Sequence, residues 1–207
     1  GEGSQYGLIA ALCFQNASGD VEAAGWGNIF FHDANIKRFN GDPRLDIAAL
    51  RPGTPVIMNG QQTQVLKYKD TEADIQGWSM RKYNPLKSTV NELNLGVGIN
   101  MYLMRLADVY LMYAEAVANG YGSPSASVPG FGKTAVDAIN YIRDRAGVGH
   151  VAAKYLTSTE TFMSEVRRER AVELAYEGHR FNDLRRWFLL IEYPYTIKTA
   201  IDFDRSA

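Results

Sequence analysis

The feature that most constrains the fold is a helical stripe that contains a charged residue. Met163, Val166, Arg170 and Leu174 recur at intervals of three and four residues, which places their side chains on one helix face. Arg170 therefore takes a core position, where an unpaired charge would cost several kcal/mol. Burial of this stripe requires carboxylates close to Arg170, so the sequence predicts an ion-pair network inside a helical core.

Carboxylates for Arg170 are available on both sides of a break in the helix. Glu173 and Glu177 follow Arg170 on nearby faces, and Gly178 interrupts the helix. Beyond the break, Arg180, Asp183 and Arg185 can fold back onto the same cluster. We predict a structural ion-pair network that consists of Arg170, Glu173, Glu177, Arg180 and Asp183.

The charge of this region is balanced. Residues 160–187 contain six acidic side chains and six arginines, and the whole chain has a net charge of −1. A surface that binds phosphate groups would have a clear basic excess. We therefore expect no nucleic-acid partner and no general attraction to an anionic membrane.

Catalytic and metal-binding interpretations of the same residues are weaker. An arginine for each of Glu173 and Glu177 predicts salt bridges and lowered pKa values, whereas a general acid needs a raised pKa. His179 has no second histidine within a helical turn, and Cys13 is the single cysteine. We predict that the protein is not an enzyme and uses no metal or cofactor.

The chain from Met101 onward has the apolar periodicity of helices. A second helix is predicted to begin at Thr134, where Asp137 completes a capping box, and to end at Gly147. The first helix of this part is predicted from an apolar stripe that ends at residues 119–120. The stripe consists of Leu103, Leu106, Tyr110, Tyr113 and Val117.

Two more helices are predicted after Gly147. One starts near Thr157, with Glu160 as the partner in its capping box, and runs to Tyr176; a short one holds residues 180–190. Two antiparallel helix pairs joined by turns are typical of tetratricopeptide-like units. Residues 101–207 are therefore predicted to be a mostly α scaffold.

Residues 1–100 have a different character. Turn signals rich in glycine and proline separate short candidate strands at residues 55–58, 62–68 and 77–83. We interpret this part as loop-rich with short strands and as the part that binds a ligand. Together with the helical scaffold it is predicted to form one continuous domain.

Three sequence blocks, at residues 101–120, 135–148 and 166–187, resemble the SusD/RagB family of Bacteroidota outer-membrane lipoproteins in content, order and spacing. Two weaker landmarks lie at residues 40–45 and 80–83. The third block is the most specific, because it combines Arg-Glu-Arg, Glu-Leu, Glu-Gly-x-Arg and Asp-Leu-x-Arg-Trp in that order.

The resemblance implies a SusD-like fold and a non-catalytic protein exposed on the cell surface. Members of the family bind a nutrient, usually a glycan and in the RagB branch a peptide, and deliver it to a SusC-like TonB-dependent transporter. Membrane contact would come only through a lipid anchor that these residues do not carry. Family members are longer, so we expect this sequence to be a C-terminal portion.

Candidate ligand contacts lie in the loop-rich part. A glycan stacks its apolar ring faces on exposed aromatic rings, while amides and arginines bind its hydroxyls. Trp26 stands between two glycines, a context that favours a loop tip, and Asn28 is a polar neighbour. Trp78 and Tyr83 lie in the candidate strand at 77–83. We predict these four residues to be ligand contacts.

Two other functions stay open. A helical-repeat adaptor would bind a protein or peptide and would be indifferent to polysaccharides. A glycan-cleaving enzyme would need two carboxylates about 5 to 10 Å apart. Outside the helical scaffold they could come only from Asp33, Asp42, Asp46, Asp70, Glu72 and Asp74.

Overall fold

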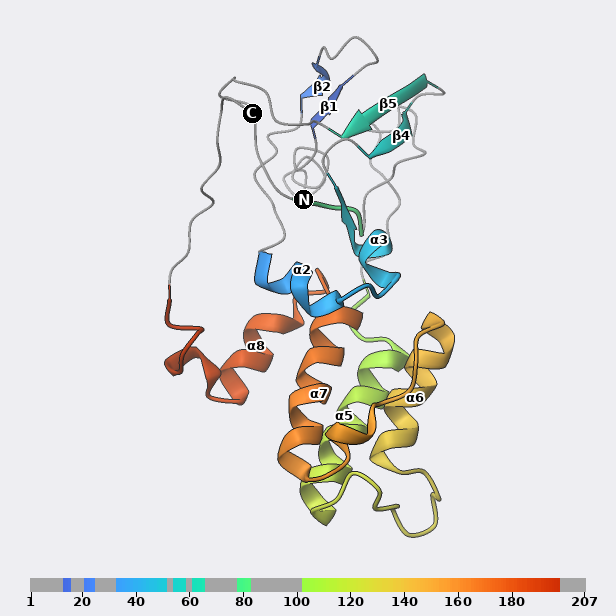
Figure 1. Cartoon of the computed structure of the whole chain (residues 1–207), viewed down its shortest axis with the longest axis vertical. Helices are drawn as coiled ribbons and strands as arrows, with labels where there is room; N and C mark the ends of the chain where they lie inside the picture. The colour runs from blue at the N-terminus through green and yellow to red at the C-terminus, as the bar shows by residue number, and fades with distance from the viewer. Residues whose placement is uncertain are drawn as a thin grey trace. The chain divides into compact units, whose positions relative to one another are not determined.

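The structure is a computed structural model in which the chain divides into two compact units (Figure 1). The first unit comprises residues 1–36, 46–101 and 188–207, and the second comprises residues 37–45 and 102–187. The structure describes residues 13–15, 21–24, 33–51, 54–58, 61–65, 78–82 and 102–197. Their predominantly helical content confirms the predicted fold class. That residues 1–100 and 101–207 are two parts of one continuous domain stays a prediction.

The first unit contains short antiparallel strands. Strands β1 (Cys13–Gln15), β2 (Val21–Ala24), β4 (Pro55–Met58) and β5 (Gln61–Val65) form a sheet in the order β2-β1-β5-β4. Strands β3 (Ala49–Leu50) and β6 (Ser79–Met80) form a separate pair. The predicted strands at 55–58, 62–68 and 77–83 thus correspond to β4, β5 and β6, and β6 is shorter than expected.

Two short helices lie between these strands in the sequence. They are α2 (Asp33–Phe39) and α3 (Arg44–Ala48), separated by a turn in which Asn40 and Gly41 have positive φ. Gly41 has φ 81°, a conformation that glycine adopts without steric cost. The turn brings the start of α3, with Asp42 and Arg44, into the second unit.

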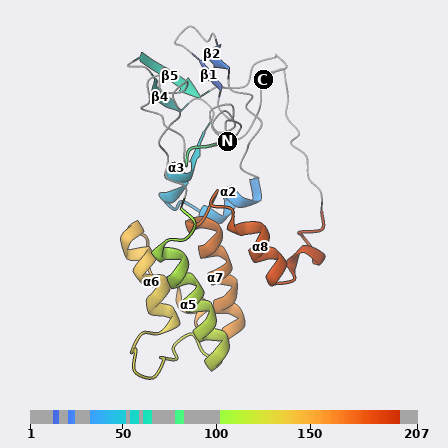
Figure 2. The same cartoon turned by 180° about the vertical axis from the view of Figure 1, so that it is seen from behind.

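Most of the second unit consists of helices, which Figures 1 and 2 show from opposite sides. They are α5 (Leu106–Tyr121), α6 (Ala135–Ala146), α7 (Thr159–Glu173) and α8 (His179–Arg186). The short 3₁₀ turn η1 (Ala153–Tyr155) precedes α7, and η2 (Leu189–Ile191) follows α8 in the first unit. Helix α5 packs against both α6 and α7. No helix within the described ranges combines the length and apolar character needed to cross a membrane.

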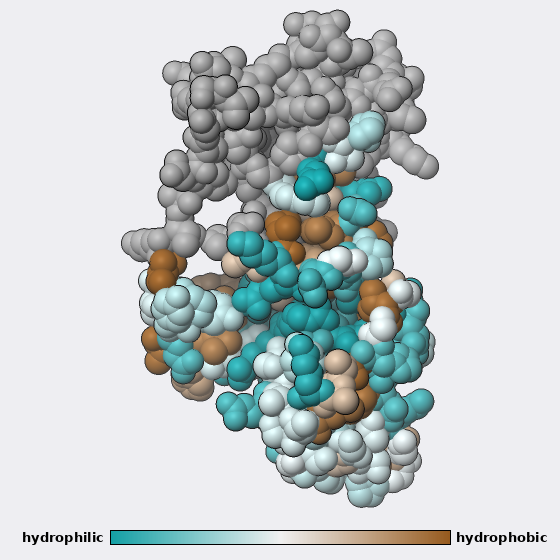
Figure 3. Space-filling view, in the orientation of Figure 1, coloured by the Kyte–Doolittle hydropathy of each residue, from teal (hydrophilic) through white to brown (hydrophobic). Residues whose placement is uncertain are grey.

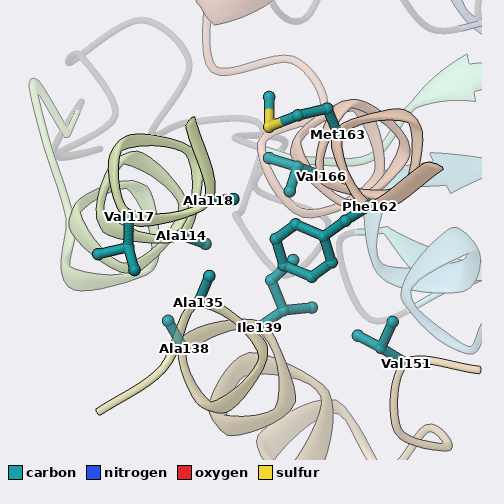
Figure 4. Packing of buried hydrophobic residues seen from close by; sticks show 10 residues of the cluster. All are labelled: Ala114, Val117, Ala118, Ala135, Ala138, Ile139, Val151, Phe162, Met163 and Val166. Carbon is teal, nitrogen blue, oxygen red and sulfur yellow. The ribbon is translucent and has the colours of Figure 1, made fainter. Parts of the chain in front are cut away.

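The apolar core of the second unit lies where α5, α6 and α7 meet (Figure 4). Phe162 of α7 is fully buried in a cluster that also contains alanines of α5 and α6. Small side chains allow helix backbones to approach closely, and a large ring then fills the remaining space. The cluster consists of Ala114, Val117, Ala118, Ala135, Ala138, Ile139, Val151, Phe162, Met163 and Val166.

The helix ends of α6 agree with the prediction. The Thr134 side chain accepts a hydrogen bond from the Asp137 backbone N–H, and the Asp137 carboxylate accepts one from the Thr134 backbone N–H. Gly147 closes the helix with φ 68°. These contacts satisfy backbone groups that the first and last turns of a helix leave without intrahelical partners.

The predicted ends of α7 were wrong by a few residues. Its capping box is formed by Ser158 and Thr161, one residue after the predicted pair, because the Thr161 hydroxyl can accept a bond as a glutamate would. The helix ends at Glu173, since Tyr176 and Gly178 beyond it have φ of 62° and 80°.

The predicted buried face of α5 was also wrong in part. Leu103 precedes the helix and is 95% exposed, and Leu106 is 60% exposed. The helix ends at Tyr121, with Gly122 as its C-cap, instead of at residues 119–120. The face that packs inward carries Asp108, whose carboxylate pairs with an arginine of α7; its other members are Ala107, Leu111, Ala114, Val117 and Ala118.

Candidate functional site

Four glutamates recur at every fourth residue along α7 and just beyond its end. They are Glu165, Glu169, Glu173 and Glu177, and this spacing places the first three on one face of α7. The first three are buried, with exposed fractions of 3%, 0% and 5%. A row of buried carboxylates is destabilising unless cations compensate it. Hydrophilic residues gather over α7 on the face shown in Figure 3.

Arg44 of α3 supplies the first compensating cation, although it is more than 120 residues away in the sequence. Its Nη1 donates to Glu169 Oε1 at 2.6 Å and to Glu173 Oε2 at 2.9 Å. Its Nε and Nη2 donate to the two oxygens of Asp42 at 2.9 and 2.6 Å. Arg44 thus joins three carboxylates, and the planar guanidinium group suits such bidentate pairing.

Arg143 of α6 and Arg168 of α7 compensate the other end of the row. Arg143 donates to Glu165 and, at 2.9 Å, to Glu169 Oε2. Arg168 donates to both Glu165 oxygens at 3.0 and 3.1 Å, and to the backbone carbonyl of Arg38 at 3.1 Å. Helices α6 and α7 are therefore joined by charge-assisted hydrogen bonds as well as by the apolar core.

Arg105, immediately before α5, binds the C-terminal end of the row. It holds both Glu177 oxygens, at 2.7 and 2.8 Å, and donates to Glu173 Oε1 at 2.6 Å. Arg145 of α6 also donates to Glu173 from a side chain that is 56% exposed. Glu173 consequently receives hydrogen bonds from three arginines of three different segments, Arg44, Arg105 and Arg145.

A second cluster surrounds Arg170. Its Nη1 donates to Asp108 Oδ1 of α5 and its Nε to Asp183 Oδ2 of α8, each at 2.8 Å. Arg186 donates to Asp183 Oδ1 at 2.9 Å and also pairs with Glu115 of α5. These pairs connect α5, α7 and α8.

Trp187 closes this second cluster. Its indole N–H donates to Glu115 Oε1 at 2.8 Å. The guanidinium carbons of Arg186 and Arg167 lie 4.5 and 5.5 Å from its ring centroid. The ring is thus held by one hydrogen bond and two cation–π contacts, an arrangement that suits packing rather than ligand binding.

The electrostatics of these clusters do not suit acid catalysis. Burial raises the pKa of the Glu173 carboxyl, but the hydrogen bonds from Arg105, Arg145 and Arg44 outweigh burial and lower that pKa to about 2. Burial likewise works against the charge of Arg44, yet its bonds to Asp42 and Glu169 raise its pKa above the ordinary value. A carboxyl group that acts as a general acid needs a raised pKa, which is opposite to the shift of Glu173.

The structure divides four of the predicted network residues between the two clusters. Arg170 and Asp183 are joined directly, and Glu173 and Glu177 are joined through Arg105. Arg180 is half-buried in the first turn of α8. That these five residues have a purely structural role stays a prediction.

Sequence reasoning did not assign several members of the network. Arg44, Arg105 and Arg143 come from distant segments, and the sequence gives no partner for them. The glutamate at every fourth residue from Glu165 onward was a local signal that could have indicated a buried row. The other unassigned members are Asp42, Asp108, Glu115, Arg145, Glu165, Arg168, Glu169 and Arg186.

Trp78 is the predicted ligand contact that lies within the described residues. It directly precedes β6, is half-buried, and has the guanidinium carbon of Arg51 5.3 Å from its ring centroid. Arg51 is exposed and directly follows β3. A partly exposed indole beside an arginine can stack on a sugar ring and donate hydrogen bonds to hydroxyl groups.

Three other predicted contacts, Trp26, Asn28 and Tyr83, lie outside the described residues. So do three of the acidic residues that a glycan-cleaving enzyme could use: Asp70, Glu72 and Asp74. Asp42 lies within them, but Arg44 holds its carboxylate. Within the described ranges no group of three or more His, Cys, Asp or Glu side chains could hold a metal ion.

The sequence model of the SusD family matches residues 12–206. The chain belongs to the SusD family. This finding confirms the resemblance seen in the three sequence blocks and extends it over nearly the whole chain. No curated protein sequence gives a significant match.

A solved SusD-like structure shares the fold of this chain. A SusD-like protein (BF3747) from Bacteroides fragilis NCTC 9343 is 20% identical, with a TM-score of 0.60 over 80% of this chain. A structure named BT4246 is 25% identical, with a TM-score of 0.52 over 72% of this chain. A SusD superfamily protein from Bacteroides vulgatus ATCC 8482 is 25% identical over 76% of this chain, with a TM-score of 0.47.

The chain spans only part of each of these three proteins. It covers 37% of the Bacteroides fragilis protein, 33% of the Bacteroides vulgatus protein and 26% of BT4246. The likeness to the Bacteroides fragilis protein therefore establishes the fold of the shared portion alone.

Proposed function

We propose that this protein is a nutrient-binding protein of the outer membrane that captures a glycan at the cell surface and delivers it to a SusC-like TonB-dependent transporter. The observation that carries the proposal is membership of the SusD family over residues 12–206. The family resemblance implies both the location and the transporter. Attachment to the membrane would come through a lipid anchor.

The ion-pair network supports a binding protein rather than an enzyme. Its buried carboxylates are engaged by arginines, and Glu173, the residue that receives the most arginines, has a pKa of about 2. A carboxyl group with such a pKa stays ionised at neutral pH and cannot donate a proton to a leaving group. The network instead joins α3, α5, α6, α7 and α8 into a support.

The ligand site belongs to the loop-rich part of the chain. Trp78, with Arg51 beside it, is the contact whose geometry supports this assignment. Trp26, Asn28 and Tyr83 complete the proposed set. Binding residues are commonly carried by loops on a rigid scaffold, which is the division of roles proposed here.

Native affinity electrophoresis tests the proposed function. The purified protein is run through gels that contain single polysaccharides, neutral and acidic, with albumin as a non-binding reference. Retardation in one or a few gels is expected, with no release of reducing ends on prolonged incubation. Retardation in none of the gels would contradict glycan binding, and peptides would be screened next for the peptide-binding or adaptor function. Release of reducing ends in proportion to protein concentration would contradict a non-catalytic role.

A further inference from the structure

Arg51 and Trp78 form a cross-strand pair at the end of the β3–β6 ladder. Leu50 of β3 pairs with Ser79 of β6, so Arg51 and Trp78 occupy the next opposed positions. Directly opposed residues of an antiparallel pair have their side chains on the same face. The 5.3 Å between the guanidinium carbon and the ring centroid agrees with this placement.

Arg51 differs from the buried arginines of the helical unit, because no carboxylate among the described residues pairs with it. Arg44 and Arg170 are buried and each holds at least two carboxylates. Arg51 is exposed, and none of the described residues supplies it with a carboxylate. Its contact with the indole face leaves the N–H groups of its planar fork available, and that fork matches the geometry of a carboxylate.

A second exposed arginine adds to the positive charge of this strand pair. Arg81 follows β6, and its backbone N–H donates to Ala48 at 2.9 Å, which extends the ladder by one residue. Its guanidinium donates to the backbone carbonyl of Asp46, a neutral acceptor. Within the part of the chain that the structure describes, no carboxylate pairs with Arg81. Among the described residues, the strand pair that holds Trp78 thus carries two arginines without a carboxylate partner, and of these Arg51 shares the face of the indole.

We propose that the Arg51–Trp78 site selects acidic sugars, with the indole stacking on the sugar ring and the Arg51 guanidinium binding its carboxylate. Uronic acids are the chemical class that combines these two features. This inference rests on the proposed function, because it names the class of glycan that the same protein would bind. Trp78 supplies affinity for any stacked sugar, whereas Arg51 distinguishes charged rings from neutral ones.

The size of the expected effect follows from the exposure of Arg51. Ion pairs between exposed groups are weak and screened by salt, and their contribution corresponds to a factor of about two to five in affinity. Removal of the Arg51 charge should therefore lower affinity for an acidic glycan about two- to fivefold. It should leave affinity for a neutral glycan of the same backbone nearly unchanged.

The test compares polysaccharides that share a backbone and differ in charge. Polygalacturonate is paired with its fully methyl-esterified form, and carboxymethyl cellulose with hydroxyethyl cellulose. Affinities are measured for the wild-type chain, Arg51→Gln, Arg51→Lys and the control Arg185→Gln, which removes an exposed arginine of α8. Each measurement is repeated at about 20 mM and about 500 mM NaCl, where the Debye length shrinks severalfold.

The expected result is tighter binding of the acidic member of at least one pair. That preference should fall in Arg51→Gln and at high salt, persist partly in Arg51→Lys, and stay unchanged in Arg185→Gln. Equal binding of both members, or a preference that Arg51→Gln does not alter, would overturn the inference while leaving glycan binding in place. Failure to bind any polysaccharide, acidic or neutral, would contradict the proposed function as well.

Discussion

Arg170 occupies a core position because aspartates from two other helices surround its guanidinium group. Asp108 of α5 and Asp183 of α8 each accept a hydrogen bond from it at 2.8 Å. Removal of two ionised groups from water is costly, and attraction between them repays that cost only in good geometry. Loss of the cation alone leaves buried negative charge without compensation, which is why single substitutions at such residues have large effects.

We predict that Arg170→Met lowers the free energy of unfolding by about 3 kcal/mol or more. Among the described residues Arg170 is the cation that pairs with Asp108, whereas Asp183 retains Arg186. The double variant Asp108→Asn, Arg170→Met should therefore be less destabilised than the sum of the two single variants. Urea denaturation measures all three.

Arg145→Met is the matched control for this prediction. Its side chain is 56% exposed, and Glu173 keeps Arg44 and Arg105 as partners. We expect a loss below about 1 kcal/mol, as for other exposed ion pairs. If Arg170→Met unfolded at the same urea concentration as the wild type, the account of a buried network would be wrong.

Stability should also depend on pH through Glu173. Its pKa is lowered from 4.5 to about 2 in the folded state, which corresponds to roughly 3 kcal/mol of stability at neutral pH. Because the folded pKa is the lower one, this stability is fully present above about pH 5 and is lost as the pH falls toward 2. Glu173→Gln should reduce the slope of unfolding free energy against pH in this window.

The control for the pH experiment is Glu192→Gln, which removes an exposed carboxylate outside the network. It should leave the slope between pH 5 and 2 close to that of the wild type. If Glu173→Gln had the same slope as the wild type, other groups would govern the acid sensitivity.

At the scale of helices and strands, local signals predicted the elements that depend on local contacts. The capping box of Thr134 with Asp137 and the cap at Gly147 are as predicted, because each is made by residues close in the sequence. The inward face of α5 was not predicted correctly, because it includes Asp108. The partner of Asp108, Arg170, is 62 residues away in the sequence. Periodicity alone favoured the apolar Leu103 and Leu106, which are exposed.

Thr134→Ala should lower the free energy of unfolding by about 1 kcal/mol, because it removes the acceptor for the Asp137 backbone N–H. Thr134→Ser keeps the hydroxyl group and should lie within a few tenths of a kcal/mol of the wild type. Thermal and urea denaturation of the two variants measure the difference. Equal loss of stability in both would indicate that the threonine methyl group, rather than the cap, is responsible.

At the candidate sites, too, local contacts could be predicted from the sequence and contacts between distant segments could not. The sequence predicted an ion-pair network from the position of Arg170 in a core stripe, and the structure pairs Arg170 with Asp183 as two of its predicted members. It could not predict Arg44 or Arg105, because arginine is common on surfaces and its partner depends on which segments fold together. Nor could it predict the contact of Arg51 with Trp78, which depends on the pairing of β3 with β6.

At the scale of the whole molecule, the two units carry different kinds of residue. The second unit contains the apolar core and the ion-pair clusters that connect its helices. Trp78 and Arg51 belong to the first unit. We therefore propose that the helical unit supplies stability and the first unit binds the ligand, so substitutions in each should change different measurements.

The most direct test of this assignment is the affinity of Trp78→Ala for a polysaccharide that retards the wild-type protein, measured beside its melting temperature. We predict a loss of affinity of about tenfold or more and a nearly unchanged melting temperature. Stacking of one ring on an aromatic side chain contributes of the order of 1 to 3 kcal/mol. Unchanged affinity in a correctly folded Trp78→Ala variant would contradict the assignment of ligand binding to this site.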